Sequence, residues 1–187
     1  LVVFSAIFGY MMAPNVVGFD LLTVLALALG GFLITGASNT LNQVIEADLD
    51  RLMTRTQRRP MAMKVLSPLE AVIFALVCGA SGITLLGLVF EGLVPALLGV
   101  IALLLYAFVY TPLKRVNSIA VFVGAIPGAM PPLIGWAAAT GSLSTEALAL
   151  FLIQFLWQFP HFWAIAWVLE DDYNKAGFKM LPANAGR

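Results

Sequence analysis

The side chains best suited to chemistry form a run of acids, amides and arginines at residues 39–60. If a helix continues through this run, Asn42, Glu46 and Asp50 fall four residues apart on one helical face. Two carboxylates and an amide oxygen suit a hard cation such as Mg²⁺, which takes oxygen ligands and usually shares substrate phosphates. Asp48 falls elsewhere on the helical wheel. The run therefore predicts a magnesium site whose ligands are Asn42, Glu46 and Asp50.

Four arginines come directly after this acidic face. Arg is suited to bidentate hydrogen bonds with phosphate oxygens. For any one of them, a solvated loop on the positively charged side of a membrane is an equally good explanation. The acids are harder to explain as loop residues, because negative charge at a helix C-terminus opposes the helix dipole. We therefore expect positive side chains to compensate the acids. The arginines are Arg51, Arg55, Arg58 and Arg59.

Two further charged clusters have the composition of a diphosphate site. One is Glu170, Asp171 and Asp172, and the other is Y-T-P-L-K-R, with Tyr110, Lys114 and Arg115. Carboxylates from two helices could hold metal ions around a diphosphate, while Lys and Arg neutralise the remaining charge. Such a site would promote departure of the diphosphate by stabilising charge as it develops. An apolar helix bundle beside it would accept an isoprenoid tail and keep water from an allylic cation.

Three polar residues, Gln154, Gln158 and His161, are spaced to share one face of a later helix. Polar side chains inside a membrane are costly and usually face the bundle interior or a cavity. The Trp and Phe residues around them could wall a planar ligand, and lipid-facing packing explains these aromatics equally well. Two roles stay open for His161: a structural histidine with satisfied hydrogen bonds, or an iron ligand or acid–base group.

The elements that must position these residues are membrane helices. Apolar residues make up 61% of the chain and charged residues 11%, and a soluble domain of this composition would expose large apolar patches. Runs of about 18 or more apolar residues indicate membrane spans. We expect an all-α polytopic membrane protein with a single domain over residues 1–187, truncated at both ends. Its six hydrophobic segments are residues 1–13 (too short to cross a membrane), 21–39, 69–89, 93–110, 118–139 and 148–169.

Charge placement predicts how these helices are oriented. Every Lys and Arg lies in residues 46–68, in residues 111–117 or in the tail after Glu170. The alternate connections, around Asp20, Glu91 and residues 141–146, contain none. By the positive-inside rule the first set faces the cytoplasm. All the charged clusters would then converge on one membrane face.

The segment at residues 118–139 is rich in Gly and Pro. It contains Gly124, Pro127, Gly128, Pro131, Pro132 and Gly135. We expect a bent or broken helix with close approaches to its neighbours.

These motifs carry a resemblance to a known family. N-Q-V-I-E-A-D-L-D-R-L-M-T-R-T-Q-R-R-P resembles the first aspartate-rich motif of the UbiA superfamily of membrane prenyltransferases. Its M-T-R-T-Q-R-R-P part, Y-T-P-L-K-R, residues 124–141 and residues 155–182 are similar to the branch that farnesylates haem. The resemblance covers essentially the whole chain. It implies a UbiA-like bundle of nine helices with a metal–diphosphate site on the cytoplasmic face. This chain would contain about six of those helices.

The resemblance also implies a reaction. The farnesyl group of farnesyl diphosphate, plus water, is added to a vinyl group of haem B, with Mg²⁺ as cofactor. The implied setting is a bacterial plasma membrane, with its lipid bilayer and the haem-maturation proteins of terminal oxidases as partners. Two positions depart from the superfamily pattern: Glu46 replaces the usual Asp, and Val168 stands four residues before Asp172, where an acid is usual.

Motif matching and spacing together assign roles to individual residues. Catalytic roles go to Asn42, Glu46, Asp50, Lys114, Arg115 and Asp172; substrate binding to Arg51, Arg55, Tyr110, Asp171, Gln158 and His161; and metal binding to Asn42, Glu46, Asp50, Asp171 and Asp172.

Two alternatives remain. A prenyltransferase of the same superfamily acting on a quinone precursor or chlorophyllide would share the first motif but not the P-H-F-W…D-D-Y stretch. A divalent-cation transporter could use the same carboxylates, although transport favours acids near the bilayer midplane. The formal net charge is zero, and we expect no nucleic-acid partner.

Overall fold

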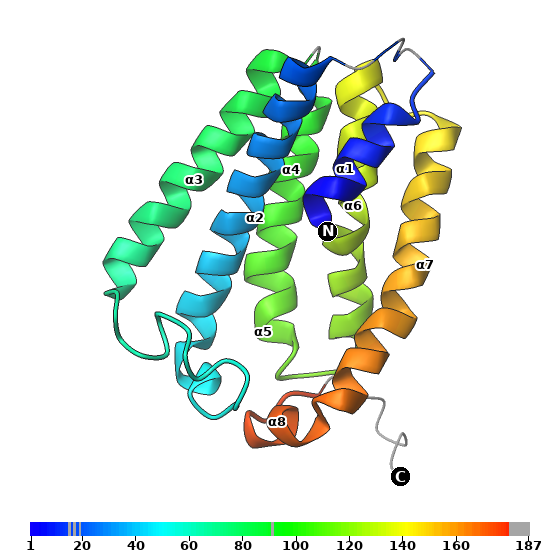
Figure 1. The fold of residues 1–187 in the computed structure, drawn as a ribbon. Coiled ribbons are helices and arrows are strands. Elements are labelled where there is room, and N and C mark those ends of the chain that lie inside the picture. The colour runs from blue at the N-terminus through cyan, green and yellow to red at the C-terminus, as the bar shows by residue number, and fades with distance from the viewer. Residues whose placement is uncertain (15, 17, 19, 91, 180–187) are drawn as a thin grey trace.

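The computed structural model describes residues 1–14, 16, 18, 20–90 and 92–179. This part of the chain is helical, with long helices standing side by side in a bundle (Figure 1). The helices are α1 (Val2–Met11), α2 (Leu21–Asp50), α3 (Pro68–Val89), α4 (Val94–Leu104), the π-helix η1 (Leu105–Tyr110), α5 (Thr111–Leu113), α6 (Ala120–Thr140), α7 (Thr145–Val168) and α8 (Glu170–Lys175).

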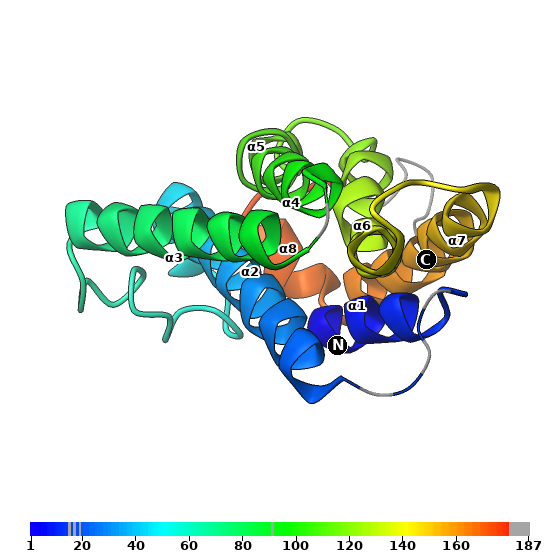
Figure 2. The same cartoon turned by 90° about the horizontal axis from the view of Figure 1, so that it is seen from above.

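Five of these stretches are long and apolar enough to cross a membrane. They are α2, α3, the continuous unit Val94–Leu113, α6 and α7. The shorter apolar helix α1 lies against α6 (Figure 2). The predicted set of six hydrophobic segments, with the first too short to span, is therefore confirmed.

Helix α2 is longer than its apolar run, as the acidic motif predicted. Its 30 residues correspond to about 45 Å at 1.5 Å per residue, whereas the hydrocarbon core of a bilayer is about 30 Å thick. The last turns, which carry the acidic motif, can therefore stand beyond the apolar span. At the other end, the Asp20 carboxylate caps the helix by accepting hydrogen bonds from the backbone N–H groups of Leu22 and Thr23.

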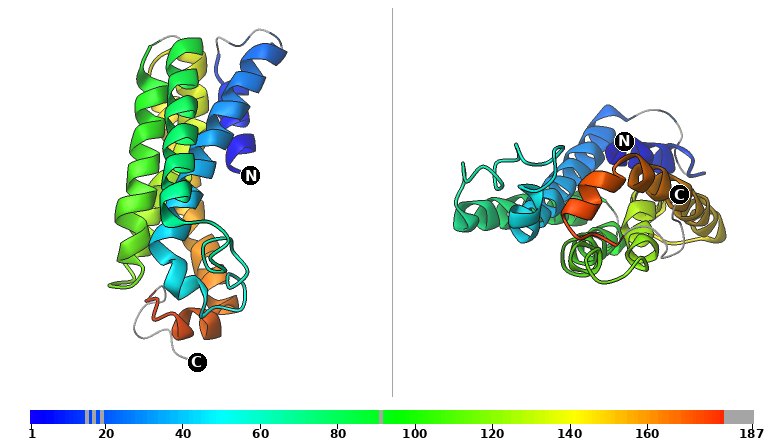
Figure 3. Two further views of the ribbon diagram at one scale, coloured as in Figure 1. Left: turned by 90° about the vertical axis from the view of Figure 1, so that its left-hand side faces the viewer. Right: turned by 90° about the horizontal axis from the view of Figure 1, so that it is seen from below.

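The connections that carry the basic residues lie together at one end of the bundle. The α2–α3 loop, the α5–α6 link and α8 occupy this end, and the other connections lie at the opposite end (Figures 1 and 3). The predicted convergence of the charged clusters is therefore confirmed for the described residues. Glu91, residues 180–182 of the last motif and Arg187 lie outside them.

Close helix contacts depend on glycine. A Cβ atom at Gly135 of α6 would lie 1.8 Å from the Ala6 carbonyl oxygen of α1, and one at Gly9 would lie 2.1 Å from the Pro132 oxygen. Between α2 and α3, a Cβ at Gly82 would lie 2.9 Å from the carbonyl oxygen of Gly30. Small residues let membrane helices approach in this way, which confirms the close approaches predicted for α6.

Of the two outcomes predicted for α6, a bend or a break, the break is wrong, since the helix is continuous from Ala120 to Thr140 through three prolines. Pro132 has no N–H group to bond the carbonyl of Gly128, four residues earlier. The side chain of Gln158 on α7 replaces that donor, because its Nε2 donates a hydrogen bond of 3.1 Å to the Gly128 oxygen. A neighbouring helix thus satisfies the backbone group that the proline leaves unpaired.

Candidate functional site

The last turns of α2 carry the predicted acidic face. Asn42, Glu46 and Asp50 are 5%, 2% and 0% exposed, whereas the side chain of Asp48 is 91% exposed. The Asn42 Nδ2 donates a hydrogen bond of 2.8 Å to Oε2 of Glu46. The spacing therefore places three oxygen-bearing side chains on one buried face and Asp48 outside it.

Lys114 compensates the charge of Glu46. Its Nζ lies 2.7 Å from Oε1 of Glu46 and donates a hydrogen bond of 2.8 Å to Oε2. The same Nζ lies 5.1 Å from the centre of the Tyr110 ring and 5.0 Å from that of Phe178, positions that favour a cation. Burial lowers the pKa of Lys114, and the adjacent Glu46 carboxylate acts in the opposite direction.

Arg59 compensates the charge of Asp50. Its Nη1 donates hydrogen bonds of 2.9 and 3.0 Å to the two carboxylate oxygens of this fully buried residue. The hydroxyl of Thr56 donates to the Asp50 carbonyl oxygen at 3.1 Å, which ties the following loop to the end of α2. The expectation that positive side chains would compensate the helix-terminal acids is confirmed at both positions.

Thr111 joins the site although the sequence did not single it out. Its buried hydroxyl donates a hydrogen bond of 2.8 Å to the Tyr106 carbonyl oxygen in η1 and accepts one of 3.1 Å from Nδ2 of Asn42. Asn42 therefore uses its amide nitrogen for both Glu46 and Thr111, and its carbonyl oxygen is left for a ligand. Single-turn π-helices are frequent at functional sites.

The second acidic cluster meets the first motif through Asp172. Its Oδ2 accepts a hydrogen bond of 3.1 Å from the backbone N–H of Arg55, and Oδ1 lies 3.2 Å from Nζ of Lys175. The Arg55 N–H group lowers the pKa of Asp172 to about 2, and Lys175 adds to this effect. Asp171 is exposed. After α8 the chain returns to α5, where the Lys179 N–H donates to the Lys114 carbonyl oxygen at 2.8 Å.

Two predicted basic residues lie away from this cluster. Arg51 donates from Nε to the Ala62 carbonyl oxygen at 2.8 Å and from Nη1 to Asp48 at 3.0 Å, so it holds the α2–α3 loop. Arg115 is exposed beyond α5.

The three polar residues of α7 differ in their burial and in their hydrogen bonds. Gln158 is buried and its Nε2 is bonded to Gly128, whereas Gln154 is half-buried and His161 is exposed. The His161 ring lies 6.0 Å from that of Phe162. The described residues show no hydrogen bond from the His161 side chain, which therefore lacks the internal partners of a buried structural histidine.

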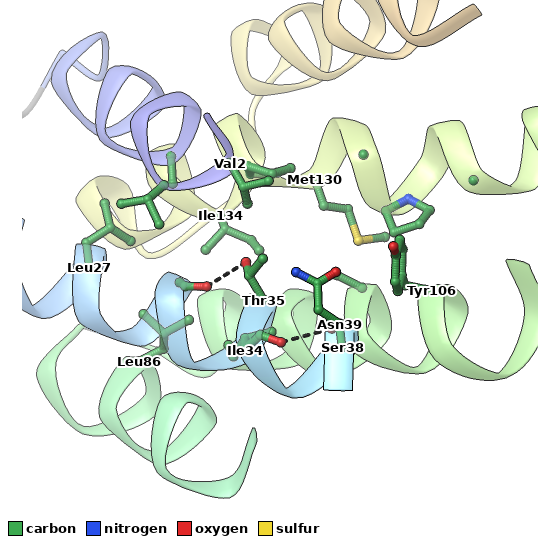
Figure 4. A pocket seen from close by; sticks show the side chains of 18 of the residues that line it. Val2, Leu27, Ile34, Thr35, Ser38, Asn39, Leu86, Tyr106, Met130 and Ile134 are labelled. Atoms are coloured by element: carbon green, nitrogen blue, oxygen red, sulfur yellow. Dashed lines mark hydrogen bonds between the residues drawn. The ribbon is translucent and has the colours of Figure 1, made fainter. Parts of the chain in front are cut away.

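An apolar cavity of about 240 Å³ adjoins the polar cluster. It lies between α1, α2, α6 and η1 (Figure 4). Leu27 and Leu86 line it on the side away from the acids, and Tyr106, whose carbonyl bonds Thr111, lines it next to them. The site can thus receive an amphiphile with an anionic head and an apolar tail.

The chemistry of the donors fits Mg²⁺. Carboxylate and carbonyl oxygens are its preferred protein ligands, and it is usually bound by one or two carboxylates together with substrate phosphates. Among the described residues, no group of three or more His, Cys, Asp or Glu side chains is close enough to hold a metal ion. An ion that is bound partly by phosphate oxygens needs only a few ligands from the protein. Glu46, Asp50 and the free oxygen of Asn42 can supply these ligands.

Comparison with known proteins agrees with this geometry. Residues 2–187 match the UbiA prenyltransferase family. The protoheme IX farnesyltransferase of Cytophaga hutchinsonii is 47% identical over 100% of this chain and 64% of its own length. That of Christiangramia forsetii is 50% identical over 97% of this chain and 59% of its own. The chain thus spans about three fifths of the length of these relatives.

A solved structure has the same fold. The apo structure of a UbiA homolog from Aeropyrum pernix K1 superposes with a TM-score of 0.75 and covers 99% of this chain and 70% of that one, at 23% sequence identity. The helix arrangement is therefore shared at low sequence similarity.

Proposed function

Because the chain belongs to the UbiA prenyltransferase family, we propose that it adds the farnesyl group of farnesyl diphosphate, together with one water molecule, to a vinyl group of haem B, giving haem O and diphosphate. Relatives of about 50% identity carry the name protoheme IX farnesyltransferase. The observation that carries the proposal is the buried cluster of Asn42, Glu46 and Lys114 beside an apolar cavity.

The diphosphate binds at the rim formed by α2, α5 and the α2–α3 loop. Lys114 and Arg59 are the buried or half-buried cations there, each already next to a carboxylate. Arg55 joins them, since its backbone is anchored to Asp172. Charge-assisted hydrogen bonds from these groups would fix the head group and stabilise the charge that develops on the departing diphosphate.

Asn42, Glu46 and Asp50 would hold Mg²⁺, with Asp172 nearby on α8. When bound, the ion would neutralise diphosphate oxygens and so assist their departure. The pairing of Glu46 with Lys114 and of Asp50 with Arg59 holds both carboxylates in place before the ligand arrives. The long side chains of Lys114 and Arg59 can then turn from the acids to the phosphates.

The farnesyl tail occupies the apolar cavity. Its wall consists mainly of aliphatic side chains and of Gly and Pro from α6, which exclude bulk water from an allylic cation. Haem B approaches along α7, where Phe159, Trp163 and the exposed His161 offer aromatic surface and a candidate iron ligand.

The protein is an integral membrane protein, and we place its charged end in the cytoplasm of a bacterial cell. The positive-inside rule supports this orientation, because the described Lys and Arg residues gather at that end. The acids at the end of α2 and in α8 lie at the same end of the bundle. This position favours a site for a diphosphate head group over a transport site near the bilayer midplane.

The proposal is tested with the full-length protein in lipid nanodiscs. Haem B, farnesyl diphosphate and Mg²⁺ are supplied, and the product is identified by mass. Formation of haem O supports the proposal. Prenylation of a quinone precursor or chlorophyllide, with haem B left unmodified, would contradict it.

A further inference from the structure

Four polar side chains line the otherwise apolar cavity, and two of them are satisfied within their own helix. They are Thr35, Ser38, Asn39 and Tyr106. Thr35 donates its hydroxyl to the Gly31 carbonyl oxygen at 2.7 Å, and Ser38 donates to that of Ile34 at 2.9 Å. Within the described residues, neither the Asn39 amide nor the Tyr106 hydroxyl makes a hydrogen bond. Figure 4 shows both side chains projecting into the cavity.

This polar pair lies where the cavity meets the charged cluster. Asn39 precedes Asn42 by three residues, hence by just under one turn of α2. The Tyr106 carbonyl accepts the Thr111 hydroxyl, which in turn accepts the Asn42 amide. A prenyl diphosphate with its head near Glu46 and its tail in the cavity would therefore place its reacting carbon beside Asn39 and Tyr106.

The Asn39 side chain is exposed and Tyr106 is half-buried, so both polar groups are accessible to a ligand that enters the cavity. Polar side chains at membrane depth usually face a cavity or a polar ligand. A single buried water needs about two to four polar partners, and an amide together with a phenol hydroxyl supplies donors and acceptors for one. The proposed reaction consumes one water for each farnesyl group. Resting on that reaction, we propose that Asn39 and Tyr106 hold the water molecule that is added together with the farnesyl group.

The bond between farnesyl C1 and oxygen breaks, and its electron pair leaves with the diphosphate. The terminal vinyl carbon of haem B gives its π electrons to C1, which leaves a cation on the inner vinyl carbon. The water held by Asn39 and Tyr106 forms a carbon–oxygen bond there, and its proton passes to the released diphosphate.

The test is the amount of haem O formed per diphosphate released, measured with the full-length protein in nanodiscs. Asn39→Leu removes the amide at similar size, and Tyr106→Phe removes only the hydroxyl. We expect the ratio to fall at least fivefold in Asn39→Leu and to fall in Tyr106→Phe, with a farnesylated haem that is lighter by one water. Thr40→Val is the matched control, because Thr40 neighbours Asn39 but bonds the Gly36 carbonyl oxygen at 2.8 Å.

An unchanged ratio in both variants, or equal losses of haem O and of diphosphate release, would overturn the inference. If Asn39→Leu does not fold, Tyr106→Phe carries the test alone. The wild-type protein separates this inference from the proposed function. Wild-type haem O that carries ¹⁸O from labelled water establishes the reaction. If the wild-type protein forms no haem O, the proposed function is refuted. If the wild-type protein forms it and the variants keep the wild-type ratio, the water site alone is refuted.

Discussion

The Lys114 ammonium lies 2.7 Å from Oε1 of Glu46, although 68 residues separate them in sequence. Both side chains are nearly buried, at 12% and 3% exposure. Removing one partner of a buried pair leaves an uncompensated charge, whereas an incoming anion can replace the carboxylate as partner of the cation. The pair therefore has the properties of a prepared site for an anionic head group.

Neutralising Lys114 should act mainly on the diphosphate. Lys114→Gln is expected to weaken farnesyl diphosphate binding about tenfold or more, since a hydrogen bond to a charged group contributes about 1.5–3 kcal/mol. The Kd of haem B should stay within about twofold of the wild-type value, which is a change of under about 0.5 kcal/mol in binding free energy. Calorimetric titration of each ligand measures this, with Lys64→Gln in the α2–α3 loop as the control. A larger loss for haem would reassign Lys114 to the haem propionates.

Gln158 should contribute to stability through the Gly128 carbonyl. Gln158→Leu leaves that carbonyl without the donor that Pro132 cannot supply, and we expect a loss of about 1–3 kcal/mol in the free energy of unfolding. Denaturant unfolding in detergent measures the loss. Gln154→Leu, on the same face of α7 but only half-buried, is the control. Equal stability of the two variants would show that the bond to Gly128 contributes nothing.

The contact between α8 and the α2–α3 loop should weaken in acid. The folded-state pKa of Asp172 is about 2, below its ordinary value of 3.8, so its ionised form stabilises this contact. That stabilisation is complete above about pH 4 and is lost as the pH falls through about 2. Hydrogen exchange at the Arg55 amide measures it. Exchange in Asp172→Asn should lack this pH dependence, and identical pH profiles for both proteins would refute the assignment.

The two ends of the bundle should lie on opposite sides of the membrane. Gln57→Cys and Ser142→Cys, each in a Cys78→Ser background, are expected to react with an impermeant thiol reagent from opposite faces, position 57 from the cytoplasm. The reason is the segregation of Lys and Arg to one set of connections. Labelling of both positions from one side of intact cells would contradict the orientation.

Periodicity and charge placement predicted the helices and the buried face of α2, because both patterns are local in sequence. The partners of that face were not predictable in the same way. Thr111 and Asn42 are 69 residues apart, and no spacing rule relates them. Arg59, rather than Arg51 or Arg55, pairs with Asp50 because the chain leaves the helix there and turns back. Likewise, the donor that bonds the Gly128 carbonyl in place of the missing Pro132 N–H comes from α7, and no local pattern in α6 indicates it.

Asp50 provides the most direct test of the metal–diphosphate site. Asp50→Asn keeps the size and polarity of the side chain but removes its charge, and Arg59, which is 30% exposed, can turn to solvent. We expect haem O production by the full-length protein in nanodiscs to fall at least about a hundredfold, the scale of losing one electrostatic contact in a transition state. Insertion and thermal unfolding should stay close to wild type, and Asp48→Asn, exposed on the same helix, should keep its turnover. Wild-type production by a folded Asp50→Asn protein would contradict the site.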